Sequence, residues 1–212
     1  MNSSSVKIGV LALQGAIEEH VQATKLALKS LDIEGEVLWV KKPEHLEGVQ
    51  GLILPGGEST VMGRLMETSG LLEAIKKFAK EGRPILGTCS GMVLLAREVY
   101  DRVVGKTGQP TLKLMDIIVE RNAFGRQGES FEEDLEIPLL GEKKFRGVFI
   151  RAPVIQSIGD NVKPLCHLNG KIVAAQQNNI LATSFHPELS EDTRLHEFFL
   201  KNATKNNLPQ SM

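Results

Sequence analysis

A five-residue segment with a cysteine at its centre, Gly87-Thr88-Cys89-Ser90-Gly91, lies between an apolar stretch and a segment with helical spacing. This is the cysteine form of G-x-S-x-G, in which a nucleophile stands on a sharp turn between strand and helix. The helix N-terminus then favours the thiolate, and the first-turn amide of Ser90 can bind an oxyanion. We expect Cys89 to be a nucleophile, with a buried structural cysteine as the alternative. Cys166 lacks this context and is expected to be an ordinary packed or surface thiol.

A histidine and a carboxylate two residues apart follow another apolar stretch, in Ser184-Phe185-His186-Pro187-Glu188. Residues two apart in an extended segment point to the same side, so His186 and Glu188 can face one another. Pro187 favours extended geometry at His186. A cysteine hydrolase needs a histidine that moves the proton and a third group that holds the imidazole. With Cys89, this pair predicts a catalytic triad; the alternative is a solvated turn with a chance pair.

Two adjacent glycines end a further apolar stretch, in Leu54-Pro55-Gly56-Gly57-Glu58-Ser59-Thr60. Glycine adopts positive φ without steric cost, so a backbone N–H can turn toward a ligand. Open α/β sheets bind ligands beyond the carboxyl ends of their strands, where this turn is expected. We therefore expect Gly57 to supply a second oxyanion donor beside Ser90, and Ser59 to cap the following helix.

The remaining histidines lack such context. His20 falls in an expected helix, His45 in a polar connection and His196 beside the apolar stripe of the last helix, so each is expected to be a surface or hydrogen-bonded residue. No Cys or His cluster has zinc-ligand spacing, and no phosphate-binding loop of the G-x-x-x-x-G-K-[ST] type occurs. We expect neither a metal nor a cofactor.

The elements that must position these residues alternate between strand and helix in the first half of the chain. This alternation predicts an α/β fold of three layers, with a mostly parallel central sheet flanked by helices. The second half predicts short strands with brief connections, added antiparallel to the sheet, and then a closing helix. The expected strands are 6–13, 36–40, 51–54, 84–87, 117–120, 135–137, 148–150, 172–175 and 180–185. The expected helices are 16–31, 59–80 with a break near 69–70, 90–99 and 191–202.

Composition narrows the class of protein. The 212 residues carry 25 basic and 26 acidic side chains, a net charge of -1, which argues against nucleic acid or an anionic membrane as a partner. No run approaches the roughly 20 apolar residues of a membrane-spanning helix. The short apolar run after the N-terminus is typical of a first strand rather than a signal peptide, so a cytoplasmic location is expected. We expect one domain over residues 1–212.

These segments together resemble the triad-type glutamine amidotransferases. Within that superfamily they look most like the glutaminase subunits of pyridoxal 5'-phosphate synthase, and the resemblance extends from near the N-terminus to the last helix. Two blocks are the specific ones: residues 119–127, VERNAFGRQ, and residues 147–153, GVFIRAP. Ser90 stands where family members often carry alanine, a change that should leave its backbone donor intact.

The resemblance implies residue roles and a reaction, the hydrolysis of L-glutamine to L-glutamate and ammonia. Cys89 would be the nucleophile, His186 and Glu188 would complete the triad, and Gly57 and Ser90 would form the oxyanion hole. The substrate contacts that it implies come from three segments: Gly57, Glu58 and Ser59; Arg121; and Ile150 and Arg151.

A partner follows partly from the chemistry of ammonia, which becomes ammonium near neutral pH and is then no nucleophile. The chain leaves no region for an ammonia acceptor, and the family implies a separate (β/α)₈-barrel synthase that builds pyridoxal 5'-phosphate. We expect its docking to fix the Gly56-Gly57 turn and switch on activity. Three alternatives remain: a glutaminase serving another synthase, such as the one making imidazole glycerol phosphate; a catalytically silent binding subunit on the same fold; and a flavodoxin-like cofactor binder.

Overall fold

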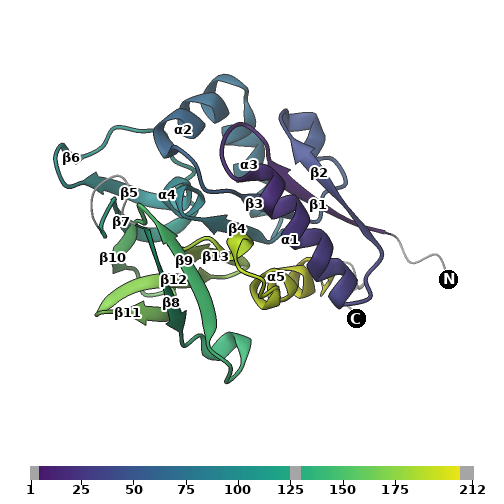
Figure 1. Cartoon of the computed structure of the whole chain (residues 1–212). Coiled ribbons are helices and arrows are strands. Elements are labelled where there is room, and N and C mark those ends of the chain that lie inside the picture. The colour runs from purple at the N-terminus through teal and green to yellow at the C-terminus, as the bar shows by residue number, and fades with distance from the viewer. Residues whose placement is uncertain (1–4, 125–129, 206–212) are drawn as a thin grey trace.

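A mixed sheet of eleven strands runs through the part of the chain that the computed structural model describes, residues 5–124 and 130–205 (Figure 1). These strands are β1 (Val6–Leu11), β2 (Gly35–Val40), β3 (Gly51–Leu54), β4 (Ile85–Thr88), β5 (Ala96–Asp101), β6 (Gly105–Lys106), β7 (Met115–Arg121), β10 (Val154–Ile158), β11 (Lys163–Leu168), β12 (Lys171–Gln177) and β13 (Ile180–Thr183). Their order is β2-β1-β3-β4-β13-β12-β10-β7-β5-β6, and β11 pairs with β12. The first five strands in this order are parallel, whereas β12, β10 and β7 alternate in direction.

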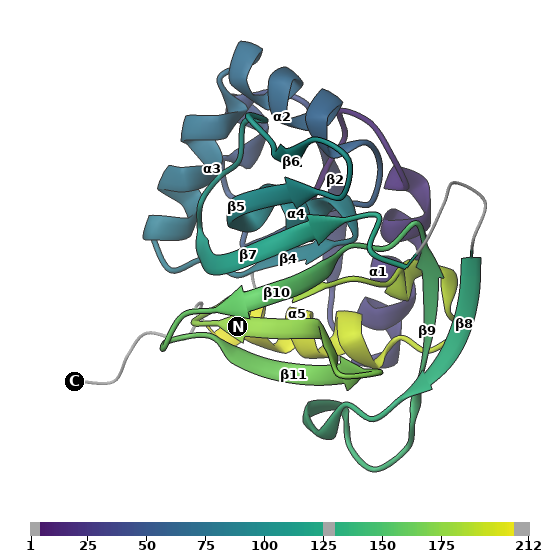
Figure 2. The same ribbon diagram turned by 90° about the vertical axis from the view of Figure 1, so that its left-hand side faces the viewer.

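A separate antiparallel ribbon of two strands, β8 (Ser130–Leu135) and β9 (Phe145–Ile150), stands apart from the main sheet (Figure 2). The helices are α1 (Ile17–Ser30), α2 (Ser59–Thr68), α3 (Leu71–Lys80), α4 (Ser90–Leu95) and α5 (Arg194–Lys205), and short 3₁₀ turns are η1 (Pro43–Leu46), η2 (Pro138–Leu140) and η3 (Pro187–Leu189). Helices α1 and α5 pack together on one face of the sheet, and α2, α3 and α4 cover the other (Figure 1).

The strands at the centre of the sheet are apolar on both faces, as strands covered by helices must be. In β3, Leu52 and Leu54 pack with the residues of α2 to α4, whereas Ile53 packs with those of α1 and α5. Strand β4 is buried along its whole length in the same way. The expected three-layer α/β fold with added antiparallel strands is thereby confirmed.

Two expected elements differ from the structure. The helix expected over 90–99 ends at Leu95, and Ala96–Asp101 forms β5 instead. Pairing decides this, because β5 lies parallel to β7 and its buried residues Ala96 and Val99 face the core. The strand expected over 135–137 is also wrong beyond Leu135, the last residue of β8. Strands β6, β10 and β11 were not expected at all.

The carboxyl ends of four parallel strands, β1, β3, β4 and β13, meet at one edge of the sheet. The segments that follow these strands contain Gln14 after β1, Gly56 after β3, Cys89 after β4 and His186 after β13. Residues distant in the sequence therefore converge beyond this edge, as ligand-binding residues of parallel α/β sheets do.

Candidate active site

Cys89 occupies the tight turn between β4 and α4. Its φ of 49° and ψ of −106° are strained values for a residue with a side chain. The neighbouring glycines make the turn possible: a Cβ at Gly91 would lie 2.0 Å from the Leu54 carbonyl oxygen, and one at Gly87 would lie 2.5 Å from Leu95. The structure thus places Cys89 at the strand–turn–helix junction that its sequence context predicts.

His186 and Glu188 face one another directly. His186 Nδ1 lies 2.7 Å from Glu188 Oε1, and both side chains are buried. The His186 amide donates to the Val148 carbonyl of β9 over 2.8 Å, which fixes the backbone. The extended conformation that the sequence predicts from His186 to Glu188 is wrong in part, because the 3₁₀ turn η3 starts at Pro187. This turn, and not the alternation of side chains along a strand, places the Glu188 carboxylate beside the His186 imidazole.

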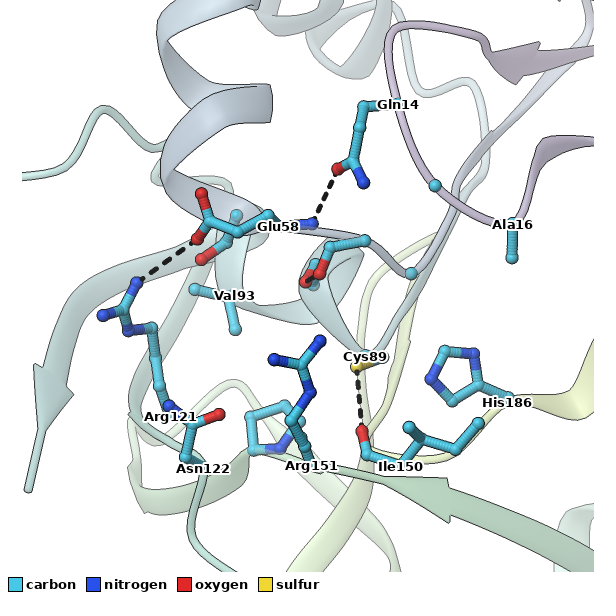
Figure 3. Close-up of a pocket in the computed structure, with 16 residues that line it drawn as sticks. Gln14, Ala16, Glu58, Cys89, Val93, Arg121, Asn122, Ile150, Arg151 and His186 are labelled. Atoms are coloured by element: carbon cyan, nitrogen blue, oxygen red, sulfur yellow. Dashed lines mark hydrogen bonds and ion pairs between the residues drawn. The ribbon is translucent and has the colours of Figure 1, made fainter. Parts of the chain in front are cut away.

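The other side of the His186 ring faces the Cys89 thiol (Figure 3). Gly56 passes close to both, since a Cβ there would lie 2.3 Å from His186 Cε1 and 3.4 Å from Cys89 Cβ. Burial alone would lower the pKa of His186, but hydrogen bonds and charge from Cys89 and Glu188 outweigh it and raise the pKa to about 10. The imidazolium form of His186 is therefore favoured near neutral pH.

A cavity of about 350 Å³ opens in front of the sulfur, a volume in the range of small-molecule sites. Every residue that the sequence assigned to substrate or oxyanion binding lines this cavity: Gly57, Glu58, Ser59, Ser90, Arg121, Ile150 and Arg151. The Cys89 sulfur lies 3.9 Å from the Ile150 carbonyl, so the end of β9 forms one wall. Glu188 does not line the cavity and reaches it only through His186.

Hydrogen bonds hold the glycine turn on both sides. The Gly56 carbonyl accepts from the Ala16 amide over 3.0 Å, and the Gly57 carbonyl accepts from the Ser90 hydroxyl. The Glu58 amide donates to Gln14 Oε1 over 2.7 Å (Figure 3). The Ser90 hydroxyl thus ties the start of α4 to the carbonyl oxygen of Gly57.

The cap of helix α2 differs from expectation. Glu58, not Ser59, is the N-cap: its carboxylate accepts from the amides of Thr60 and Val61 at 3.1 and 2.9 Å. Partial burial would raise the pKa of Glu58, but these two backbone hydrogen bonds, with the nearby Arg121 charge, lower it overall. Ser59 is the first helical residue and is buried, with its hydroxyl 3.4 Å from Gln109 Oε1.

Arg121 is held in place at the far end of the cavity. Its Nη1 donates to Thr60 Oγ1 over 2.9 Å and to Gln109 Oε1 over 3.2 Å, and its Nη2 donates to Asp101 Oδ2 over 3.1 Å. Nε is buried and has no hydrogen-bond partner among the described residues. Arg151 has a positive φ of 46° at the end of β9, and its guanidinium points into the cavity (Figure 3). The site therefore holds two cationic groups, one rigidly placed.

Residues 10–205 match the SNO glutamine amidotransferase family. The chain belongs to this family. It is 48% identical over 200 residues to the pyridoxal 5'-phosphate synthase subunit PdxT of Thermococcus gammatolerans, covering 93% of this chain and 99% of that protein. It is 52% identical to the subunit PdxT of Methanosarcina mazei, over 92% of this chain and 97% of that protein.

Solved structures agree. A crystal structure of a glutamine amidotransferase shares 49% identity with a TM-score of 0.81, covering 93% of this chain and 98% of that one. PurLQS from Thermotoga maritima, at 17% identity and a TM-score of 0.62, covers 97% of this chain and 100% of that one and supports the fold alone. The family expected from the sequence is confirmed, and with it the function of a glutamine amidotransferase in pyridoxal 5'-phosphate synthesis.

Residues 125–127, the last three of the VERNAFGRQ block that carries the family resemblance, lie outside the described residues. Where the chain is described, no group of three or more His, Cys, Asp or Glu side chains could hold a metal ion. No helix in the same part of the chain is long and apolar enough to cross a membrane.

Sequence reasoning missed three residues that hold the groups around the cavity in place. Gln14 orients the glycine turn, and Asp101 and Gln109 hold Arg121. Gln14 had a usable signal, because it follows β1 at the same carboxyl edge as Gly57 and Cys89. Asp101 had none, since most of β5 was expected to be the end of a helix, and Gln109 had none because it lies in the connection between β6 and β7.

Proposed function

We propose that Cys89, His186 and Glu188 are the triad that hydrolyses L-glutamine to L-glutamate and ammonia in this chain. One observation supports this most strongly: the His186 ring is hydrogen bonded to a buried carboxylate at one nitrogen and faces a cysteine on a strained turn with its other side. This is the arrangement that nucleophile, base and orienting group need.

The steps follow from these positions. The Cys89 thiolate attacks the side-chain amide carbon of glutamine, and the carbonyl oxygen becomes an oxyanion. Backbone N–H groups of Gly57 and Ser90 hold it, each worth about 3 to 4 kcal/mol in a comparable hydrolase. His186 donates its proton to the leaving ammonia, which leaves a thioester. The neutral imidazole then takes a proton from water, hydroxide attacks the thioester, and glutamate departs.

Glutamine binding would use the groups that line the cavity. Arg121 pairs with the substrate carboxylate, because guanidinium geometry suits carboxylates and Asp101 fixes its orientation. Arg151 adds a second positive charge. Glu58 and Ser59, with Gly57, form the wall beside Cys89, and Ile150 closes the opposite side.

The ammonia would pass to a separate (β/α)₈-barrel synthase subunit that makes pyridoxal 5'-phosphate. Relatives at 48 to 52% identity carry the name of a pyridoxal 5'-phosphate synthase subunit, which supports this partner. We also propose that docking sets the glycine turn, whose Gly57 carbonyl now bonds to the Ser90 hydroxyl. Full glutaminase turnover by the isolated chain would contradict that. The cytoplasmic location and the single domain over 1–212 stay predictions.

The triad is tested by replacing its sulfur. We expect Cys89→Ala to abolish glutamate release from glutamine in the complex with the synthase subunit, because no thioester can form. Cys166→Ala is the matched control, since this second buried thiol lies outside the cavity, and it should keep wild-type kcat. Ammonia release by Cys89→Ala at the wild-type rate would refute the assignment.

A further inference from the structure

A cluster of buried polar residues lies behind the triad, on the side of Glu188 away from His186. It consists of His20 of α1, His196 of α5 and Thr88 at the end of β4, all fully buried. His20 Nε2 lies 3.2 Å from Glu188 Oε2 and 2.9 Å from Thr88 Oγ1. His20 Nδ1 lies 3.2 Å from His196 Nε2. The reaction as derived above uses none of these three residues.

The second oxygen of Glu188 depends on this cluster. Oε1 accepts from His186, whereas Oε2 is fully buried and has no well-aligned hydrogen bond among the described residues. His20 Nε2 approaches it to 3.2 Å, and the same nitrogen lies 2.9 Å from Thr88 Oγ1, so its N–H is shared between these two oxygens. A buried carboxylate oxygen without a donor is costly, so the His20 N–H is the group that keeps this oxygen, and with it the whole carboxylate, in position.

The protonation states in the cluster follow from the contacts. Burial, with the neighbouring His196 and His186, lowers the pKa of His20 well below its ordinary value, and burial lowers that of His196 to about 4. Both rings are therefore neutral at pH 7. A carboxylate only accepts, so the proton of His20 is on Nε2, and its Nδ1 must accept from His196 Nε2–H. His196 Nδ1 then carries no proton, and this nitrogen is buried without a hydrogen-bond partner among the described residues.

We propose that His20 is a positioning residue of the triad: its Nε2–H holds Glu188 Oε2 so that Oε1 faces His186, and His196 fixes the tautomer that makes this possible. The inference rests on the triad proposed above. It extends the chain of contacts from the sulfur through His186 and Glu188 to His20 on α1 and His196 on α5. The packing of these two helices thereby sets the orientation of the imidazole.

The test compares two variants at position 20 with a control on the same helix. His20→Leu removes the donor, whereas His20→Gln keeps an N–H donor at the position of Nε2. Thr24→Val is the control: Thr24 is buried one turn later, and its hydroxyl donates to the His20 carbonyl without reaching Glu188. Glutamate release is measured in the complex with the synthase subunit.

We expect His20→Leu to lower kcat by about 10- to 100-fold, the usual effect of losing an outer partner of a reactive group, with KM changed less than about threefold. His20→Gln should recover most of kcat, and Thr24→Val should match the wild type. A wild-type kcat for His20→Leu, with Cys89→Ala inactive, would overturn the role of His20 alone. Activity in Cys89→Ala would instead refute the triad.

If His20→Leu does not fold, the kcat values of His20→Asn and His20→Gln can be compared instead. The amide nitrogen of His20→Asn falls at the position of Nδ1, so it reaches toward His196 and not Glu188. His20→Asn should therefore have a low kcat and His20→Gln a high one, at similar thermal stability. Equal kcat values for these two polar variants would contradict the proposal.

Discussion

Cys89 and Cys166 are both buried, but their surroundings prepare them for different chemistry. The Cys89 sulfur faces the His186 imidazolium and an open cavity. Cys166, on β11, is buried in an apolar cluster that includes residues of β8 and β9. Burial, with the negative charge of Glu136, raises the pKa of Cys166 to about 11. A thiol in that environment stays protonated and is a poor nucleophile.

Selective labelling should therefore distinguish the two cysteines. We expect iodoacetamide at pH 7 to modify Cys89 and leave Cys166 unmodified in the folded protein, as read by peptide mass spectrometry. In urea, both should react, because unfolding removes the burial of Cys166. Equal modification of both thiols in the folded chain would contradict the environments described for them.

Arg121 offers a second prediction about a single side chain. Arg121→Lys keeps the positive charge but loses the planar guanidinium, whose N–H groups donate to Thr60, Gln109 and Asp101. Charge-assisted hydrogen bonds are worth about 1.5 to 3 kcal/mol, so we expect KM for glutamine to rise about tenfold or more, with a smaller change in kcat. Arg97→Lys, which alters an exposed ion pair with Asp116, is the control. An unchanged KM would remove Arg121 from the substrate site.

The triad residues that sequence reasoning found each have a local signal, whereas Arg121, Ile150 and Arg151 were implied by the family resemblance alone. Cys89 has its flanking glycines, and His186 has Glu188 two residues later. The structure brings them to one cavity, but their roles stay predictions. Gln109 could not be found, because its neighbours Thr60 and Arg121 come from other strands and helices, and no local pattern records such contacts.

At the scale of elements, periodicity identified the parallel half of the sheet better than the rest. Strand β3 and the break between α2 and α3 lie where the sequence predicts them. The segment after Leu95 does not, because its apolar residues fit a helix and a strand equally well and only pairing with β7 selects the strand. Strands β10 and β11 carry polar residues on exposed faces and so lacked a clear apolar run.

The packing of α1 on α5 predicts acid sensitivity. His196 is neutral and buried there, with a pKa lowered to about 4 from about 6.5. The unfolded chain binds the extra proton first, so this contribution to stability is present above pH 6.5 and is lost as the pH falls toward 4. One such histidine changes the free energy of unfolding by about 1.4 kcal/mol per pH unit, or about 3 kcal/mol over this interval.

Urea unfolding between pH 6.5 and 4.5 measures this effect. We expect the free energy of unfolding of His196→Gln to depend less steeply on pH than that of the wild type, by about 1.4 kcal/mol per pH unit, because the titrating group is gone. His45→Gln, at an exposed histidine, should leave the slope as it is. An identical slope for His196→Gln would mean that this ring does not stay neutral inside the fold.

At the scale of the whole molecule, the ammonia that the proposed reaction releases beside Cys89 would have to reach a separate synthase subunit. In the complex, ammonia must reach the acceptor before it becomes ammonium. We expect amide-labelled [¹⁵N]glutamine, supplied with excess unlabelled ammonium at pH 7, to give pyridoxal 5'-phosphate that retains the label. Mass spectrometry of the product measures this. Dilution of the label by the added ammonium would show that the two subunits exchange ammonia through bulk water.

Strand β13 lies at the centre of the sheet but comes last among the strands in the sequence, so the sheet cannot be completed until late in synthesis. A ribosome delivers β1 to β4 and the Cys89 sulfur long before it delivers residues 180–188, which fill the gap between β4 and β12. Until then, β4 presents an unpaired apolar edge of the kind that invites aggregation. The nascent polypeptide also has a thiol without its imidazole. On the proposed mechanism, glutamine hydrolysis therefore waits until residues 180–188 have been made and β13 has joined the sheet.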